Sequence, residues 1–513
     1  MNGRTIPKEV ELKLELPPAS LRALRQVPLF KTPPTHTREI SVYFDTDKQK
    51  LRKNGLMLRV RRTRNRYVQT IKATNNSGPF ERDEWEAELA GQEPDLRMAE
   101  GTALEQLAND KLRRQLKPLF ETRVHRSVYP IADDRRAIAL TVDRGSIDTG
   151  NHSMPLCEIE LELQRGKLAD LFDVARELSR TLPVRIAVKS KSHRGYELLD
   201  GMQHAPVKGK PIDLPRDGIT RDAFKTIGIA CLGQIIGNEP AVVRDDPEGV
   251  HQMRVGLRRL RAGMSLFSNL LHDPQTATIK SELKWLAAEL GPARELEVLV
   301  NRVIAPMKKQ RVRWEGVPSL SQQITKKRKA ALTRAKNAVN SARFRALTLE
   351  LAAWLQAGQW TTPRDDLIRD RGDLMTSVFA AEQLTRRWRK LRKKRKPLTQ
   401  IDAPNRHKLR ILAKKLRYAV EFFASLFASR RQTKRRRSLL KALEQLQDSL
   451  GELNDIAVDE QRLTVMGFRR GSNRNRIFAA GLLTGRENAR AEAAMVAATK
   501  AHEEVTKVKP FWP

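Results

Sequence analysis

Glu9-Val10-Glu11-Leu12-Lys13-Leu14-Glu15-Leu16 is the stretch that decides the fold of the N-terminal part of this chain. Its charged and apolar residues alternate without a break. Because successive side chains of a β-strand point to opposite faces, the stretch predicts a strand with one charged and one apolar face. Working outward, the same alternation recurs in six further segments: Ile40–Asp45, Met57–Arg62, Tyr67–Lys72, Glu84–Leu89, Ala137–Val142 and Glu158–Leu163.

Segments of helical period lie between these strands, at Ser20–Gln26, Glu100–Leu116 and Lys167–Leu182. Residues 1–205 are therefore predicted to form an α+β domain built mostly on antiparallel strands. Residues 206–218 belong to a stretch with three Pro and three Gly and are predicted to be a linker. Residues 219–510 show helical period almost throughout and predict an all-α helical domain.

The charged residues of the strands fall on common faces. On one strand alone, a charged face turned to water is the ordinary interpretation and needs no function. Repetition on five strands, with acids on some and bases on others, favours a closed barrel with a charged lumen. Carboxylates bind hard divalent cations and Arg and Lys neutralise phosphate oxygens, so such a lumen suits a metal–triphosphate complex. The faces are Glu9, Glu11, Lys13 and Glu15; Arg59 and Arg61; Arg82, Glu84 and Glu86; Glu158, Glu160 and Glu162; and Lys189 and Lys191, read as strand neighbours.

Glu9-Val-Glu11-Leu-Lys13 matches the ExExK signature of the CYTH, or triphosphate tunnel metalloenzyme, superfamily. ExExK alone is a weak pattern, but further family-like pieces follow in order over residues 6–200, and the set is specific. The pieces are Tyr43-Phe44-Asp45-Thr46, Leu56-Met57-Leu58-Arg59-Val60-Arg61, Thr70-Ile71-Lys72, Arg82-Asp83-Glu84-Trp85-Glu86, Arg126, Val142-Asp143-Arg144-Gly145, Cys157-Glu158-Ile159-Glu160-Leu161-Glu162 and Ser190-Lys191-Ser192-His193-Arg194-Gly195-Tyr196.

The resemblance implies an eight-stranded antiparallel β-tunnel that hydrolyses triphosphates with Mg²⁺ or Mn²⁺, most like the bacterial branch that cleaves inorganic triphosphate. Carried over by position, the metal ligands are Glu9, Glu11, Glu158 and Glu160. The triphosphate-binding residues are Lys13, Arg59, Arg61, Lys72, Arg82, Arg126, Lys189, Lys191 and Arg194. The catalytic candidates are Lys13, Lys72 and Glu84, and the attacking water could be activated by Lys72, by Glu84 or by the metal. Adenylate cyclase and thiamine triphosphatase, which the family includes, remain alternatives.

The composition points to a polyanionic partner. The 513 residues carry a net charge of +37, of which residues 201–513 hold +30. Two cysteines make a disulfide framework improbable, and no signal-peptide pattern opens the chain, so a cytoplasmic location is expected. No run of about 18 uncharged apolar residues occurs, so no membrane span is expected.

The helical part contains an internal duplication. His251-Gln-Met-Arg254-Val-Gly-Leu-Arg258-Arg-Leu-Arg261 resembles His407-Lys-Leu-Arg410-Ile-Leu-Ala-Lys414-Lys-Leu-Arg417, and the two histidines are 156 residues apart. A matched end follows each copy, Leu290-Gly291-Pro-Ala-Arg294-Glu295 and Leu450-Gly451-Glu-Leu-Asn454-Asp455. Helical geometry gathers each His and its three bases in one stripe beside an apolar seam. A solvated face is the usual interpretation of such a stripe, but like charges at these spacings repel, and a bound anion would relieve the repulsion.

This pattern resembles the CHAD domain over about residues 216–510, and Glu295, where Asp is expected, is a departure from it. The resemblance implies two pseudo-symmetric four-helix bundles that bind long-chain inorganic polyphosphate and associate with polyphosphate granules. The polyphosphate-binding candidates are His251, Arg254, Arg258, Arg261, His407, Arg410, Lys414 and Arg417.

Two further interpretations remain open. One is a noncatalytic protein that only binds polyphosphate. The other is a nucleic-acid-binding protein, which the basic run Arg386–Lys396 would favour. Aromatic residues make up only 5% of the chain, and no RNP, zinc or basic-zipper signature occurs, so nucleic acid is expected to bind only nonspecifically.

Overall fold

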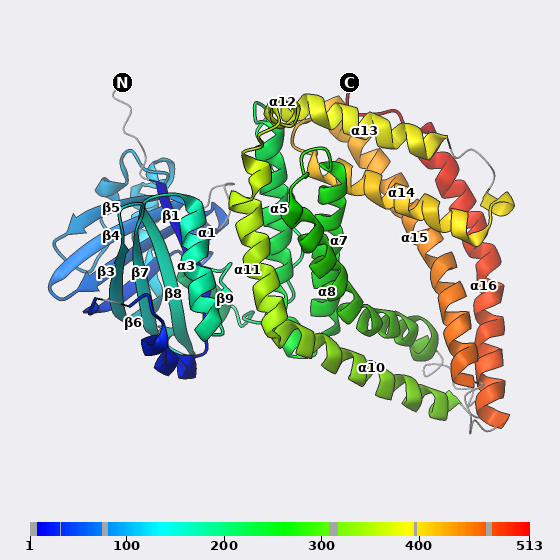
Figure 1. Cartoon of the computed structure of the whole chain (residues 1–513), viewed down its shortest axis with the longest axis horizontal. Helices are drawn as coiled ribbons and strands as arrows, with labels where there is room; N and C mark the ends of the chain where they lie inside the picture. Colours follow the sequence, from blue (N-terminus) through cyan, green and yellow to red (C-terminus); the bar gives the residue numbers. More distant parts are fainter. Residues whose placement is uncertain (1–7, 31, 74–80, 307–316, 394–397, 468–473) are drawn as a thin grey trace. The chain divides into compact units, whose positions relative to one another are not determined.

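The computed structural model describes residues 8–30, 32–73, 81–306, 317–393, 398–467 and 474–513 (Figure 1). Within these ranges, the described part does not include the side chains of Lys8, Glu9, Glu81, Arg82, Met466, Gly467 and Arg476. The chain divides into two compact units. Unit 1 comprises Met1–Val207, Leu232–Ala241 and Val339–Thr361; unit 2 comprises Lys208–Cys231, Val242–Ala338 and Thr362–Pro513.

The alternating segments of the N-terminal part fold into one antiparallel sheet, and all seven predicted strand segments overlap strands of this sheet. The sequence missed the long strand β6. The strands are β1 (Lys8–Glu15), β2 (Thr35–Asp45), β3 (Leu56–Thr63), β4 (Arg66–Ala73), β5 (Glu81–Leu89), β6 (Lys117–Ala132), β7 (Ala137–Asp148), β8 (Ser153–Arg165) and β9 (Arg185–Ile186).

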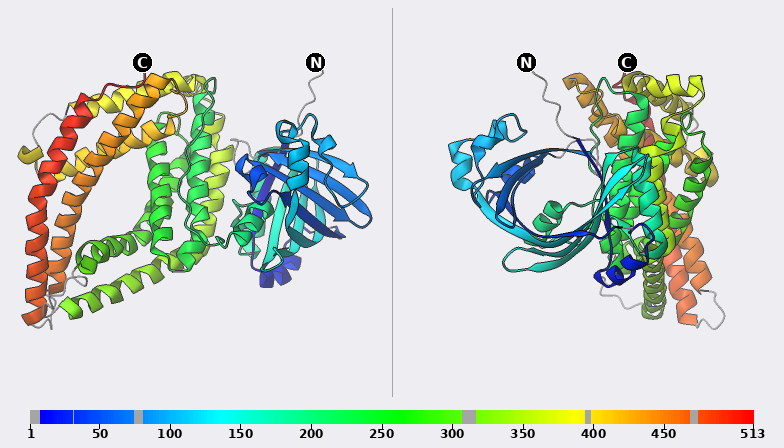
Figure 2. Two further views of the ribbon diagram at one scale, coloured as in Figure 1. Left: turned by 180° about the vertical axis from the view of Figure 1, so that it is seen from behind. Right: turned by 60° about the vertical axis from the view of Figure 1, so that its left-hand side comes forward.

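The sheet closes on itself. Its order is β5-β4-β3-β2-β6-β7-β8-β1, and β1 also pairs with β5, so eight strands form a ring around a lumen (Figure 2, right). The sheet has nine strands where eight were predicted, because the two-residue β9 adds to the far end of β1. Closure leaves alternate side chains of every strand facing inward. The predicted charged lumen is therefore geometrically possible.

A short helix fills part of the ring. Helix α4 (Lys191–Leu199) places Tyr196 and Leu198 in one apolar cluster with Tyr43 and Phe120. The Phe120 ring stacks on Tyr43 at 4.7 Å and meets Tyr196 edge-on at 5.1 Å. A Cβ at Gly195 would lie 2.1 Å from Phe120, so this glycine lets α4 approach β6 closely. The helix begins where the Ser190 hydroxyl accepts a hydrogen bond from the His193 backbone.

This helix corrects one expectation. Lys189 and Lys191 were read as strand neighbours sharing a face, but Lys191 is the first residue of α4 and Lys189 precedes it. The remaining helices of the N-terminal part are η1 (Pro18–Gln26), α1 (Lys50–Lys53), η2 (Leu96–Ala99), η3 (Glu105–Leu107), α2 (Asp110–Gln115) and α3 (Leu168–Thr181). The segment Glu100–Leu116 thus holds two short helices where one was expected.

The described residues beyond 219 are mostly helical, as predicted (Figure 1). Its helices are α5 (Thr220–Gly237), α6 (Glu239–Val243), α7 (Pro247–Leu266), α8 (Pro274–Leu299), the π-helical turn η4 (Val300–Ile304), α10 (Val317–Asn340), α11 (Ala342–Ala357), η5 (Gln359–Thr361), α12 (Asp366–Asp373), α13 (Thr376–Arg392), η6 (Leu398–Gln400), α14 (Ala403–Phe422), α15 (Arg430–Gly467) and α16 (Arg474–Lys507). Among the described residues, one stretch, Thr220–Val243, is long and apolar enough to cross a membrane, and 67% of its apolar window is buried inside the protein.

The internal duplication appears as a repeated helical hairpin. The pair α7 and α8 corresponds to the pair α14 and α15. Both α7 and α14 are 20 residues long, and an aspartate caps each N-terminus, Asp246 in the first copy and Asp402 in the second. Helix α7 packs on α14, so the two copies meet within unit 2.

Candidate functional site

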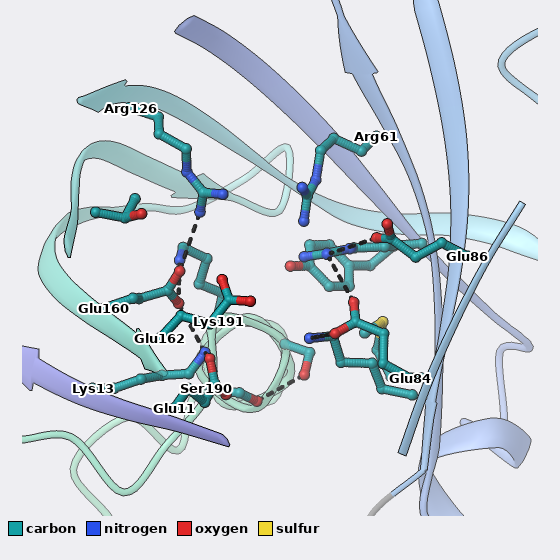
Figure 3. A pocket seen from close by; sticks show the side chains of 16 residues that line it. Glu11, Lys13, Arg61, Glu84, Glu86, Arg126, Glu160, Glu162, Ser190 and Lys191 are labelled. Atoms are coloured by element: carbon teal, nitrogen blue, oxygen red, sulfur yellow. Dashed lines mark hydrogen bonds and ion pairs between the residues drawn. The ribbon is translucent and has the colours of Figure 1, made fainter. Parts of the chain in front are cut away.

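The lumen of the ring holds a cavity of about 620 Å³ with charged walls (Figure 3). Its lining includes cationic and carboxylate side chains from β1, β3, β4, β5, β6, β8 and α4. These residues are Lys13, Arg59, Arg61, Lys72, Arg126 and Lys191, together with Glu11, Glu84, Glu86, Glu160 and Glu162. Tyr43, Met57, Thr141, Ser190 and Ser192 complete the lining. Acids and bases therefore share one cavity, as the strand patterns predicted.

One wall is a dense ion-pair network centred on Glu160. Lys13 Nζ lies 2.8 Å from Glu160 Oε1 and 2.8 Å from Glu11 Oε2. Arg126 Nη2 lies 3.2 Å from Glu160 Oε2 and donates to Asp143 Oδ2 at 2.7 Å. Burial alone would raise the pKa of Glu160, but the surrounding cations outweigh burial and hold this pKa well below its ordinary value. Glu160 is therefore ionised at neutral pH.

The opposite wall carries three cations, Lys72, Arg59 and Arg61. Lys72 Nζ lies 2.6 Å from Glu84 Oε2, and Arg59 lies 3.6 Å from the other oxygen of Glu84 and 4.0 Å from Glu86. Arg61 projects beside Arg59, and this neighbour, together with burial, lowers the pKa of Arg61. An anion between the walls would relieve this repulsion, because guanidinium groups bind phosphate oxygens strongly.

Three carboxylates at the base of the first wall could hold a metal ion. One oxygen each from Asp143, Glu158 and Glu160 lies within 4.8 Å of the others. Asp143 and Glu158 are fully buried. Such oxygen donors suit Mg²⁺ or Mn²⁺. The position is favourable to a cation, because the ammonium of Lys191 contacts all three residues. The donor set therefore fits the divalent cation that the resemblance implies.

The structure brings most of the predicted tunnel residues together. Nine line the cavity: Glu11, Lys13, Arg59, Arg61, Lys72, Glu84, Arg126, Glu160 and Lys191. Glu158 and Arg194 lie behind this lining and are ion-paired with each other. Lys189 does not line the cavity and instead pairs with Glu197 at 2.7 Å. The side chains of Glu9 and Arg82 lie outside the described part, although their backbones face each other where β1 meets β5.

Three inward residues were not assigned from the sequence. Asp143 is fully buried and binds both Arg126 and Lys191. Glu39 on β2 lies 3.7 Å from both Arg61 and Arg126. Tyr43 lines the cavity from the same strand. The period-2 alternation of β2 and β7 was a signal for all three, because each shares its parity with other inward side chains.

A second candidate site lies in unit 2, where the two basic stripes meet. Burial lowers the pKa of Arg410 and Lys414 in the second stripe, and Arg258 from the first stripe lowers both further, so these charges lie close together. The pKa of Lys414 is lowered to about 7 by burial and by the charges of Arg410, Arg258 and Arg417. Asp455 raises this pKa but does not outweigh them. Burial is the largest cause of this lowered pKa, and the neighbouring positive charges add to it. A polyanion would offset the repulsion between these charges.

The matched glycines have a shared role beside the stripes. A Cβ at Gly451 would lie 3.0 Å from Nη2 of Arg410, and one at Gly291 would lie 3.4 Å from Nη1 of Arg254. In each copy, an arginine of the basic stripe therefore crosses over the glycine of the following helix. A Cβ would crowd the arginine at Gly451, whereas at Gly291 it would make an ordinary van der Waals contact.

The two copies differ at their histidines. His407 Nδ1 lies 3.0 Å from Asn454 Oδ1. In the first copy Arg294 stands at the position of Asn454, and Nδ1 of His251 is buried without a hydrogen-bond partner. Burial and Arg294 lower the pKa of His251 to about 4, so its ring is neutral at pH 7.

The flanks of the two stripes also differ. Glu295, the departure noted in the sequence, is ion-paired with Arg462. Arg261 is exposed at the end of its stripe. Arg258 of the first stripe, by contrast, lies close enough to Arg410 and Lys414 of the second to affect the pKa of both.

Comparison with known proteins identifies both parts of the chain. A CYTH domain model matches residues 7–196, and a CHAD domain model matches residues 226–464. The crystal structure of the CHAD domain from the plant Ricinus communis is 30% identical and covers 58% of this chain and 97% of that one, with a TM-score of 0.50. The chain belongs to the CHAD family and carries a CYTH domain before it. The charged cavity thus lies in the CYTH domain, and the basic stripes lie in the CHAD domain.

The CYTH domain has an inorganic triphosphatase among its relatives. Inorganic triphosphatase from Haemophilus influenzae is 29% identical over 197 residues, which make up 37% of this chain and 55% of that protein. The chain thus spans about 55% of the length of this curated relative. A putative adenylyl cyclase from Hippeastrum, described as having a dominant triphosphatase activity, is 18% identical and covers 37% of this chain and 95% of that one, with a TM-score of 0.31.

Proposed function

We propose that the CYTH tunnel hydrolyses inorganic triphosphate with the help of a divalent cation. The observation that carries the proposal is the cavity itself. It has a volume of about 620 Å³, and six cationic side chains and several carboxylates line it. A triphosphate needs several cations to neutralise its oxygens, and its metal needs carboxylates nearby. The triphosphatase relative supports the same reaction.

Two groups of residues would bind the phosphates and the metal, and a third residue would act on the attacking water. Phosphate oxygens would be held by Arg59 and Arg61 on one wall and by Lys13, Arg126 and Lys191 on the other. The metal would be held by oxygens of Glu11, Asp143, Glu158 and Glu160. When bound, the metal neutralises charge on the phosphates and orients the phosphorus for in-line attack by water.

Glu84 is the base that this chain supplies for the attacking water. Its carboxylate lines the cavity, and Lys72 at 2.6 Å and Arg59 at 3.6 Å hold it in place. Glu84 can accept a proton from water at the phosphate while Lys72 keeps the carboxylate oriented.

The lining favours an inorganic substrate over a nucleotide or thiamine ester. Among the described lining residues, the aromatic one is Tyr43. Tyr43 is 2% exposed, and its ring is already stacked on Phe120. No ring face is therefore offered to an adenine or a thiazole in this part of the cavity, and selectivity rests on phosphate contacts alone.

The test is phosphate release from inorganic triphosphate, ATP and thiamine triphosphate by the full chain with Mg²⁺ or Mn²⁺. We expect inorganic triphosphate to be the best substrate and Glu11→Gln to reduce its turnover at least 100-fold. Glu121→Gln is the matched control, because Glu121 pairs with Arg123 on the exposed side of β6. Equal turnover by Glu11→Gln and wild type would contradict the proposal, as would a preference for ATP.

We also propose that the CHAD domain binds long-chain polyphosphate where its two stripes meet, and that the protein associates with polyphosphate granules in the cytoplasm. The crowded cations at Arg258, Arg410 and Lys414 support this proposal. The double variant Arg258→Met with Lys414→Met should weaken polyphosphate binding at least tenfold at 150 mM salt. Nucleic acid that competed equally well at that salt would favour nonspecific polyanion binding instead. A chain that binds polyphosphate but releases no phosphate would be a binding protein only.

A further inference from the structure

Lys191 occupies the place where the carboxylates converge. Its Nζ lies 2.7 Å from Asp143 Oδ2 and 3.0 Å from Glu160 Oε1, and it is also ion-paired with Glu158 Oε1. These are the three carboxylates that lie within 4.8 Å of one another. The ammonium of Lys191 thus stands among the oxygen donors that fit a divalent cation.

The position of Lys191 is well defined by its surroundings. Burial works against its charge, yet Asp143, Glu158 and Glu160 outweigh burial and hold its pKa above the ordinary lysine value. Lys191 is the first residue of α4, which the Ser190 cap and the Tyr196 packing fix inside the ring. The lysine is therefore charged and anchored at its backbone, while its long side chain can turn.

Lys191 also faces the cavity. It is one of the residues that line the proposed triphosphate site. A single ammonium cannot serve the carboxylates and the phosphates at full strength at the same time. Its contacts with the carboxylates in the absence of ligand therefore compete with its proposed role toward phosphate.

We propose that Lys191 is a placeholder cation, which fills the Asp143, Glu158 and Glu160 cluster until a divalent cation enters and then turns to the triphosphate. This inference rests on the proposed function, because it uses the same metal site. The carboxylates hold a divalent cation only after Lys191 leaves them, so the free energy needed to break its ion pairs weakens metal binding in the free protein. The released ammonium then strengthens triphosphate binding, which couples the two ligands.

The test is the affinity of the full chain for Mn²⁺ without triphosphate, measured by electron paramagnetic resonance of free Mn²⁺. Lys191→Met removes the competing cation and should lower the dissociation constant at least tenfold. Lys191→Gln should act in the same direction and serves where the methionine variant folds poorly. In EDTA, Lys191→Met should melt at a lower temperature than wild type, because the buried carboxylates have lost a partner. Mn²⁺ should raise the melting temperature of the variant and so remove this difference.

Lys72→Met is the matched control. It removes one positive charge from the same cavity, but Lys72 pairs with Glu84 on the opposite wall. We expect it to change Mn²⁺ affinity less than about threefold, because a distant charge acts only through the general field. The inference would be overturned if neither Lys191 variant bound Mn²⁺ more tightly than wild type. It would also be overturned if Lys72→Met increased the Mn²⁺ affinity as much as the Lys191 variants did. Failure of the wild type to hydrolyse any triphosphate would overturn the proposed function instead, and the Mn²⁺ titration would still decide the role of Lys191.

Discussion

Glu160→Gln should destabilise the tunnel more than the substitution of a surface carboxylate does. The Glu160 side chain is 15% exposed and accepts from Lys13 at 2.8 Å, from Lys191 at 3.0 Å and from Arg126 at 3.2 Å. Glutamine keeps the size of the side chain but removes the charge. Three largely buried cations then lose one of their partners at once.

The size of this loss in unfolding free energy depends on which carboxylate partners each cation retains. Breaking a buried ion pair by removing one partner costs about 3–5 kcal/mol. Lys13 retains Glu11, and both Lys191 and Arg126 retain Asp143. Because no cation is left without a carboxylate, the loss falls at the lower end, about 3 kcal/mol.

The assay is urea denaturation of the full chain in EDTA at pH 7, read by hydrogen exchange in peptides from β1 and β8, which report on the tunnel alone. Glu121→Gln is the control, because its pair with Arg123 is exposed and surface pairs contribute about 0–1 kcal/mol. Equal free energies of unfolding for Glu160→Gln and Glu121→Gln would refute the reasoning, since they would mean that the Glu160 network adds nothing beyond a surface pair.

Two predictions concern the CHAD domain. Because the pKa of Lys414 is lowered to about 7 and polyphosphate favours its charged form, binding should take up protons, and the affinity should fall as the pH rises from 6 to 8.5. Lys414→Met should flatten this pH dependence in fluorescence anisotropy titrations, and an unchanged slope would contradict the assignment. Gly451→Ala places a Cβ 3.0 Å from Arg410 and should weaken polyphosphate binding about fivefold, roughly 1 kcal/mol. Gly291→Ala meets Arg254 at the looser distance of 3.4 Å, so it should cost less, and an equal loss at both glycines would argue against a specific contact.

The sequence predicted the charged faces of the strands because strand periodicity is local, whereas the closed tunnel was implied by the resemblance to the CYTH family. The alternation from Glu9 to Leu16 is enough to place Glu11 and Lys13 on one face, and the structure puts both into the cavity. Closure of the ring by β1 and β5 is a long-range pairing, which periodicity alone does not report. The ninth strand, β9, is only two residues long and carries no periodic signal.

The errors have physical causes too. Lys189 was placed with Lys191 by strand parity, but the Ser190 cap starts a helix between them, and parity loses its meaning there. Asp143 was quoted in a motif without a role, because its importance arises from contacts with Arg126 and Lys191, which only the folded ring brings near. Likewise, the duplication predicted two basic stripes, whereas their meeting at Arg258 depends on how α7 packs on α14.

Metal dependence of phosphate release tests the central claim most directly. The wild-type chain would be given inorganic triphosphate with Mn²⁺, and free phosphate would be followed before and after excess EDTA and again after Mn²⁺ is restored. The charged tunnel predicts turnover with the metal, loss of at least 99% of it with EDTA, and recovery on restoration. Turnover that persists in EDTA, or no turnover under any of the three conditions, would contradict a metal-dependent triphosphatase in this cavity.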